Sequence, residues 1–139
     1  MTTFGALPFI HRGSVTISYA IEPAARRVTI RVDGPTTYED WESSIRTVLA
    51  DPQYRPGFDF LSDRRTADPP PTIDMVRRAV GFFELNRPRF GDCRWALVVS
   101  GPAAYGMGRM AEALAAETGV RVKVFTQMTA ADEWLRHPG

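Results

Sequence analysis

The sequence has little of the chemistry that disulfides and metal sites need. It contains one cysteine, Cys93, and two histidines among 139 residues. A single cysteine excludes an internal disulfide and a multi-cysteine zinc or iron–sulfur site, and two histidines argue against a histidine-built metal site. No apolar run approaches the ~18 residues that a membrane span needs. We therefore expect no metal or other cofactor, no membrane span and a reducing, cytoplasmic setting.

An excess of charge of one sign is absent as well. The chain has 17 Lys and Arg against 16 Asp and Glu, a formal net charge of +1, which argues against a nucleic-acid binder that works through bulk charge. Charged residues make up 24% and hydrophobic residues 44%, as is ordinary for a folded domain. At ~100–200 residues per domain, we expect an irregular N-terminal lead-in over residues 1–13 and a single domain over residues 14–139.

Hydrophobic periodicity predicts an α/β domain. Apolar residues alternate over 15–21 and 28–32, which indicates two half-buried strands that form an antiparallel hairpin. Strands and helices then alternate, giving the order β-β-α-β-α-β-α-β-α, which is typical of parallel strands joined by crossovers. We expect a mixed sheet that starts with the hairpin and is packed with helices. The later strands are expected at 58–61, 95–99 and 120–124, and the helices at 37–50, 72–86, from 101 to Gly119, and after Thr129.

Two local signals fix the expected boundaries near the third strand. Thr36 precedes Glu39 by three residues, the spacing of a capping box, and predicts the start of the first helix. The segment from Ser62 to Pro71 is expected to be irregular, because it ends in three consecutive prolines.

The pattern Gly106-Met107-Gly108-Arg109-Met110-Ala111 fits G-x-G-x-x-G/A, but its context differs from that of a dinucleotide site. The preceding strand ends near Ser100, and Pro102 already starts a helix, whereas in the dinucleotide motif the first glycine forms the turn after the strand. We expect these glycines to let the helix pack closely on the sheet. There is no G-x-S-x-G elbow, and neither histidine lies in a segment typical of a catalytic loop. We therefore expect no catalytic residue and no enzyme activity.

A basic pair, Arg64-Arg65, directly follows the third expected strand. Ligands of open α/β sheets bind outside the carboxyl ends of the strands, and a helix that starts at Thr72 offers free amides to an anion. A site for an anionic ligand between loops 62–72 and 100–109 and a solvated charged loop both fit this pattern. The candidate ligand or partner residues are Ser62, Asp63, Arg64, Arg65, Thr72, Tyr105 and Arg109.

The helix expected at 72–86 has an apolar arc of about half its circumference, wider than the ~100° that one core face requires. Burial of the extra arc by neighbouring segments and exposure to a partner both fit this width. In the second case, two copies related by a two-fold axis would form a homodimer, with Phe82 as the anchor of the interface. The candidate self-association patch consists of Met75, Arg78, Ala79 and Phe82.

Five segments, taken with the element order, resemble a known family. They are Phe58–Arg64, Trp95–Val99, Tyr105–Met110, Val122–Phe125 and Ala130–Leu135. Over residues 14–136 the chain resembles a SpoIIAA-like protein of the STAS group, the anti-sigma-factor-antagonist-type domains. The resemblance implies a mixed sheet packed with helices and a non-enzymatic regulatory module that binds a protein partner. The wider group also resembles lipid-binding domains of the CRAL-TRIO type, which implies a small anionic or lipid-like ligand as the alternative.

The resemblance also points to a modification site. The antagonist proteins carry their phosphoacceptor in an Asp-Ser-Ser-Gly-like motif at the start of the helix after the third strand. This chain has Pro71–Met75 there, without the tandem serine and the glycine. Thr72 offers the only hydroxyl at that helix start and is the candidate phosphoacceptor.

Overall fold

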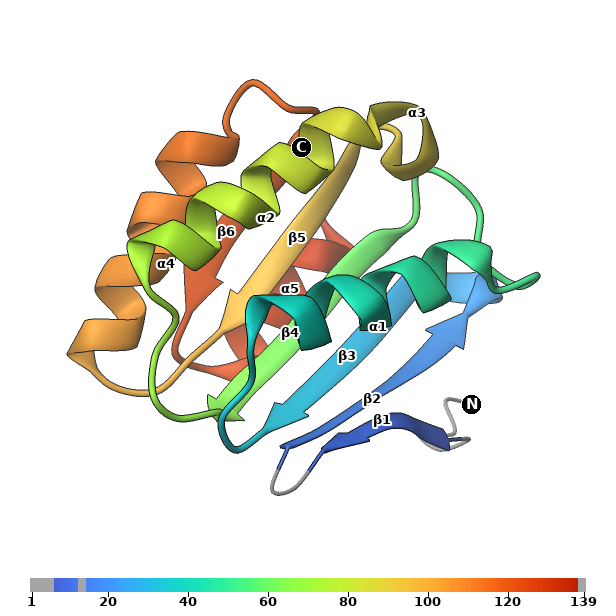
Figure 1. Ribbon diagram of the computed structural model, residues 1–139. Coiled ribbons are helices and arrows are strands. Elements are labelled where there is room, and N and C mark those ends of the chain that lie inside the picture. Colours follow the sequence, from blue (N-terminus) through green and yellow to red (C-terminus); the bar gives the residue numbers. More distant parts are fainter. Residues whose placement is uncertain (1–6, 13–14, 138–139) are drawn as a thin grey trace.

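The computed structural model describes residues 7–12 and 15–137, with side chains from residue 17 onward. Within these residues six strands form one sheet, and they are ordered in it as they are in the sequence (Figure 1). Strand β2 runs antiparallel to both of its neighbours, β1 and β3, whereas β3 to β6 are parallel. This mixed sheet with an antiparallel start confirms the predicted fold class. The strands are β1 (Leu7–Arg12), β2 (Val15–Glu22), β3 (Arg27–Asp33), β4 (Asp59–Thr66), β5 (Cys93–Val98) and β6 (Val120–Phe125).

The helices cover the two faces of the sheet unequally. Each new parallel strand is added on the same side of the previous one, so crossovers of one hand place their helices on one face. Figure 1 shows α1, α2 and α4 on that face, which we call the α2 face, and α5 on the opposite face, the α5 face. The helices are α1 (Tyr38–Ala50), α2 (Ile73–Leu85), the short α3 (Arg87–Phe90), α4 (Pro102–Ala115) and α5 (Met128–Arg136).

Strand β1 corrects the expectation of an irregular lead-in over residues 1–13. It pairs with β2 at the edge of the sheet, and the pairing register shifts between Pro8 and Ile10. An edge strand tolerates a proline, because one side of its backbone needs no partner. The sheet therefore starts before the predicted domain boundary at residue 14, which itself lies outside the described residues, as do residues 1–6.

The start of α1 is shifted by one residue from the predicted capping box. Thr37, not Thr36, is the N-cap: its hydroxyl accepts from the backbone amide of Asp40 at 3.1 Å, and the Asp40 carboxylate accepts from the Thr37 amide at 3.4 Å. Only one of two adjacent threonines can occupy the cap position. The Thr36 hydroxyl is consequently buried without a hydrogen-bond partner.

Aromatic side chains fill the core on the α2 face. The ring of Phe60 in β4 stacks on Trp95 in β5, with centroids 4.3 Å apart and planes inclined by 10°. Phe83 of α2 lies 5.3 Å from Trp95, and Trp41 of α1 lies 6.2 Å from it. Phe90 of α3 closes the cluster, 5.9 Å from Phe60. The first two crossovers, α1 between β3 and β4 and α2 with α3 between β4 and β5, are thus held against the sheet at one aromatic cluster.

The structure contradicts the prediction that Phe82 anchors a self-association patch on α2. Phe82 is only 4% exposed and belongs to the core, where its ring meets Trp41 edge-on at 5.8 Å. Met75 and Ala79 are half-buried on the side of α2 that faces the sheet and its neighbours, whereas Arg78 is exposed. The wide apolar arc arises because α2 is the middle helix of its layer, with α1 on one side and α4 on the other. Burial within one chain therefore accounts for Phe82, and self-association through the remaining residues stays a prediction.

Helix α4 approaches β6 very closely at Gly108. A Cβ placed on Gly108 would lie 2.3 Å from Cγ2 of Val124, whereas one placed on Gly106 meets nothing within 4 Å. Both glycines lie inside the helix, as expected, and Gly108 provides the close packing. With Gly108 turned toward β6, Met110 and Leu114 of the same helix are 41% and 38% exposed.

We predict that Gly108→Ala destabilises the protein by about 1–3 kcal/mol, because the added methyl group overpacks the contact with Val124. Gly106→Ala is the matched control, since it adds the same methyl group to the same helix where space is open. It should leave stability unchanged or raise it by up to about 1 kcal/mol through helix propensity. Urea unfolding of the two variants measures the difference, and equal midpoints would contradict the proposed contact.

Candidate functional site

Strand β4 is longer than predicted and separates the residues that were expected to share a loop. Ser62, Asp63, Arg64 and Arg65 all belong to the strand. Because successive side chains of a strand point to opposite faces, Ser62 and Arg64 lie on the α2 face with Phe60. Asp63 and Arg65 lie on the other face, where they pair at 2.9 Å. The structure therefore places Ser62 and Arg64 together on the α2 face and separates them from Asp63 and Arg65.

A pocket lies between the sheet and its helices at the carboxyl ends of the parallel strands. We call it the Arg64 pocket; its volume is about 100 Å³. Its walls come from α1, α2, α4 and three strands, and apolar side chains dominate them. These include Trp41, Met75, Val80, Phe83, Trp95 and Leu97. The location is the one at which open α/β sheets bind ligands.

Arg64 contributes a positive charge to this apolar pocket. Its side chain is half-buried, and it makes no hydrogen bond or ion pair with any part of the chain that the structure describes. Burial lowers the pKa of the Arg64 guanidinium to about 10, because no carboxylate offsets its desolvation. The group is still a cation at neutral pH, and it stands in a low-dielectric surrounding without a counter-charge.

Arg94, which is buried more deeply than the half-buried Arg64, shows how the fold holds a charge that stabilises its structure. Arg94 is 5% exposed and donates to Asp59 Oδ2 at 2.8 Å. It also donates to the backbone carbonyls of Trp134 and Leu135, each at 2.7 Å, and so ties the end of α5 to the sheet. The side chain of Arg94 thus donates three hydrogen bonds, whereas that of Arg64 donates none within the described residues.

Two hydroxyl groups line the pocket beside Arg64. Ser62 is two residues before it on the same face of β4 and is 2% exposed. Thr36 follows β3, the strand next to β4, and its buried Oγ1 has no hydrogen-bond partner. Buried polar groups are nearly always hydrogen-bonded in folded proteins. An orphaned hydroxyl, a second hydroxyl and an unpaired guanidinium therefore gather in one pocket.

Thr36 was missed as a candidate residue because its spacing to Glu39 suggested a cap. The one signal in the sequence was the pair of adjacent threonines, because only one of the two hydroxyls can cap the helix and the other needs a different partner. Of the remaining candidates, Thr72 caps α2, where its exposed hydroxyl accepts from the Met75 amide at 3.2 Å. Its role as a phosphoacceptor stays a prediction.

Tyr105 and Arg109 lie on the outer surface of α4 and do not line the Arg64 pocket. Tyr105 is 37% exposed, and Arg109 pairs with Glu112 at 3.0 Å. Helix α4 instead contributes Ala111 to the pocket wall. The predicted site between loops 62–72 and 100–109 is thus shifted toward the helices.

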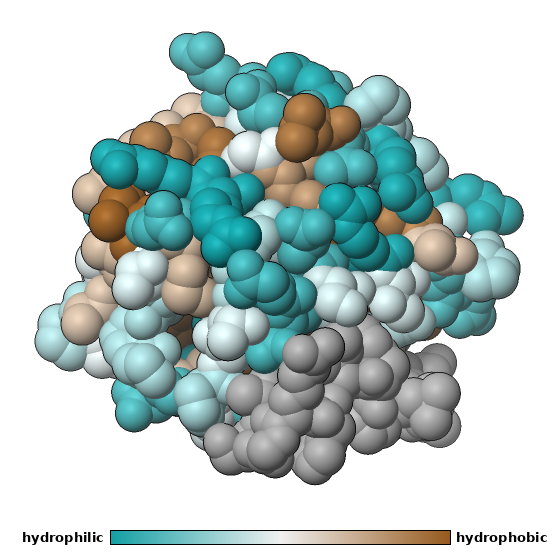
Figure 2. All heavy atoms as spheres, in the orientation of Figure 1, coloured by the Kyte–Doolittle hydropathy of each residue, from teal (hydrophilic) through white to brown (hydrophobic). Residues whose placement is uncertain are grey.

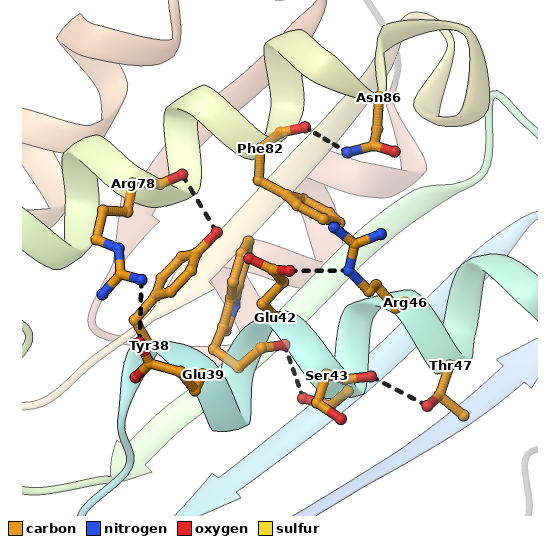
Figure 3. A network of polar contacts seen from close by, with 11 residues as sticks. Tyr38, Glu39, Glu42, Ser43, Arg46, Thr47, Arg78, Phe82 and Asn86 are labelled. Carbon is orange, nitrogen blue, oxygen red and sulfur yellow. Dashed lines mark hydrogen bonds and ion pairs between the residues drawn. The ribbon is translucent and has the colours of Figure 1, made fainter.

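A second hollow, of about 820 Å³, runs along α1, but its charges are already paired (Figure 3). Arg78 donates to Glu39 at 3.0 Å, and Arg46 donates to Glu42 at 2.8 Å, which holds the pKa of Glu42 below its ordinary value. Burial raises the pKa of Tyr38 to about 12, and its hydroxyl donates to the backbone carbonyl of Arg78. These are surface ion pairs of small energetic value. Asp51, which also lines the hollow, accepts from the Tyr19 hydroxyl at 2.7 Å and from the Gln53 amide at 2.9 Å.

Other chemistry finds little support in the described residues. No three His, Cys, Asp or Glu side chains of residues 17–137 gather as a metal site requires. Cys93 is buried, and desolvation raises the pKa of its thiol to about 12, so it is no nucleophile at neutral pH. Among the described helices, none has the length and apolar character to cross a membrane.

The comparisons with known proteins bear on the fold. No protein-family model and no curated protein matches this chain. A solved structure is similar to it: an uncharacterised protein of the DUF3478 family from Shewanella loihica PV-4, described as having a SpoIIAA-like fold. The TM-score is 0.61 at 20% identity, over 91% of this chain and 98% of that one. This chain has a SpoIIAA-like fold. The fold implied by the sequence resemblance is thereby confirmed.

We predict that Arg64→Met stabilises the ligand-free protein by about 1–3 kcal/mol. The substitution removes an unpaired charge from an apolar pocket, and methionine retains an unbranched apolar stem. Arg65→Met is the matched control, because Arg65 is the next residue, exposed, and ion-paired on the other face. It should change stability by less than about 1 kcal/mol. Urea unfolding tests both variants; destabilisation by Arg64→Met would mean that Arg64 has a structural partner.

Proposed function

We propose that the protein binds a small ligand with an apolar body and a negative charge in the Arg64 pocket. The observation that carries this proposal is the unpaired Arg64 guanidinium in an apolar surrounding. A buried charge without a partner destabilises the fold. Departures from a fully satisfied core are typical of functional sites, so a charge retained at this cost supports a binding role.

The pocket would strengthen the attraction between the guanidinium and an anion. Charges interact more strongly in a low-dielectric surrounding than in water, and hydrogen bonds between ionised groups are the strong ones. A bound anion would also satisfy the Ser62 and Thr36 hydroxyls. Binding would thus resolve two unfavourable features of the ligand-free pocket at once, the unpaired Arg64 guanidinium and the unpartnered Thr36 hydroxyl.

The residues of the pocket favour binding over catalysis. Its described lining contains no carboxylate, histidine or cysteine, and its titratable side chains are Arg64 and Tyr38. General acid–base catalysis needs a group whose pKa lies near the working pH, and neither side chain is of this kind. We therefore propose a non-enzymatic function.

A regulatory role with a protein partner is a second candidate, and the surface of α4 favours it. The SpoIIAA-like fold supports such a role through the resemblance described above. Exposed apolar side chains gather over α4, which Figure 2 shows on the left of the molecule, and they include Met110 and Leu114. The same helix carries Ala111 in the pocket wall. A partner bound to α4 would therefore contact an element that also contacts the ligand.

The ligand proposal is tested by a thermal-shift screen of small carboxylates, phosphates and sulfonates, together with native mass spectrometry of the purified protein. At least one compound should raise the Tm of the wild type in a saturable manner, as expected for a ligand that binds the folded state alone. Arg64→Met should abolish the shift, and Arg65→Met should retain it. A wild type that binds no compound in an Arg64-dependent manner would contradict the proposal.

Partner binding is tested by photocrosslinking in cells. A benzophenone amino acid in place of Met110 should yield a discrete crosslinked species, because the side chain lies on the exposed face of α4. The same group in place of Glu84, which is exposed on α2, is the control and should yield none. The absence of a specific product at Met110 would argue against this second function.

A further inference from the structure

We infer that the ligand is a monocarboxylate with a short, compact hydrocarbon tail, whose carboxylate pairs with Arg64 between the hydroxyls of Thr36 and Ser62. This inference rests on the proposed function and names the class of compound that the pocket takes. It follows from three properties of the pocket: its charge, the arrangement of its hydrogen-bond donors, and its size.

The charge of the pocket matches a single negative charge. Arg64 supplies the one formal charge among the described lining residues, and no acidic side chain opposes it. A carboxylate of charge −1 neutralises it. A phosphate monoester carries about −1.5 to −2 at neutral pH and would leave excess negative charge in an apolar surrounding, which is costly.

The donors of the pocket suit the two oxygens of a carboxylate. The guanidinium is a planar fork that matches a carboxylate in a bidentate manner. An ionised carboxylate has about four lone-pair positions, so the fork leaves acceptor sites for further donors. The hydroxyls of Thr36 and Ser62 come from adjacent parallel strands or their ends and reach the same pocket. They are the donors that would complete the coordination of the head group.

The size of the pocket limits the tail. Its volume of about 100 Å³ is smaller than the ~150 Å³ cavity that holds benzene. A carboxylate with roughly two to four further carbon atoms fits this volume. The walls around it are aromatic and aliphatic, including Trp41, Phe83 and Trp95. A hydrocarbon tail loses nothing there, whereas a hydroxylated tail would lose its hydrogen bonds to water.

Calorimetric titration with four matched compounds tests the inference. Isobutyrate should bind, whereas isobutyramide, which has the same shape without the charge, should bind at least about ten-fold more weakly. Octanoate should bind more weakly than isobutyrate because its tail exceeds the pocket, and inorganic phosphate should give no saturable heat. All titrations are made with the full chain at constant ionic strength.

Three variants locate the carboxylate. Arg64→Met should abolish isobutyrate binding, and Thr36→Val and Ser62→Ala should each weaken it about ten-fold through the loss of one hydrogen bond to a charged group. Thr47→Val is the matched control, since the Thr47 hydroxyl is exposed on α1 and donates to the backbone carbonyl of Ser43. It should leave the affinity unchanged.

The failure of this inference is distinguishable from failure of the proposed function. Equal binding of the amide, preference for octanoate, or preference for phosphate would overturn the carboxylate class or its size, while an Arg64-dependent ligand would still support the pocket. If no carboxylate binds and the broader screen finds no Arg64-dependent ligand, both are overturned. Isobutyrate binding that survives in Arg64→Met would place the carboxylate elsewhere and contradict the inference.

Discussion

The stacking of Phe60 on Trp95 is the contact on which the rest of the α2 face depends. It lies across β4 and β5, and the crossover helices place Trp41, Phe83 and Phe90 around it. One step further along the same face, the register pairs Ser62 with Leu97 in place of two aromatic residues. The aromatic core therefore ends before the strands do. The remaining space at their carboxyl ends is the Arg64 pocket, so its position follows from where the large side chains of the core stop.

Arg94 and Arg64 show two uses of the same side chain. Arg94 pairs with Asp59 and donates to two backbone carbonyls, and it fixes α5 to the sheet. Such a group stabilises the fold only with its partners in place, because a buried charge left alone is costly. Arg64 has no such partners within the described chain, although Asp63 and Arg65 form an ion pair next to it on the other face. The difference lies in the alternation of β4, which keeps the neighbouring carboxylate on the wrong side of the sheet for Arg64.

The sequence predicted the fold well, and the site in part, for identifiable reasons. The periodicity of apolar residues predicted the hairpin and the order of strands and helices, because an element that buries one face repeats apolar residues at a regular spacing. Strand β4 was predicted to end at residue 61, because Ser62 and Arg64 broke the apolar pattern. Those polar residues lie on the α2 face of the strand, where they line the Arg64 pocket, and a search for alternating apolar residues takes them for a loop. The sequence also predicted Thr36 as the cap of α1, where the structure has Thr37. Cap spacing alone does not distinguish two adjacent threonines.

The width of the apolar arc on α2 has two physical sources that a sequence does not separate. Part of the arc, including Phe82 and Phe83, packs into the core, because α2 lies between α1 and α4. Another part, Met75 and Ala79, lines the Arg64 pocket. Protein interiors are close-packed, and a small residue in a wall leaves space only where nothing larger reaches it from the opposite side. The wall that α4 contributes is also an alanine, Ala111. These two small side chains leave space in the pocket and the unpaired Arg64 gives it a charge, and the proposed apolar anion would match both.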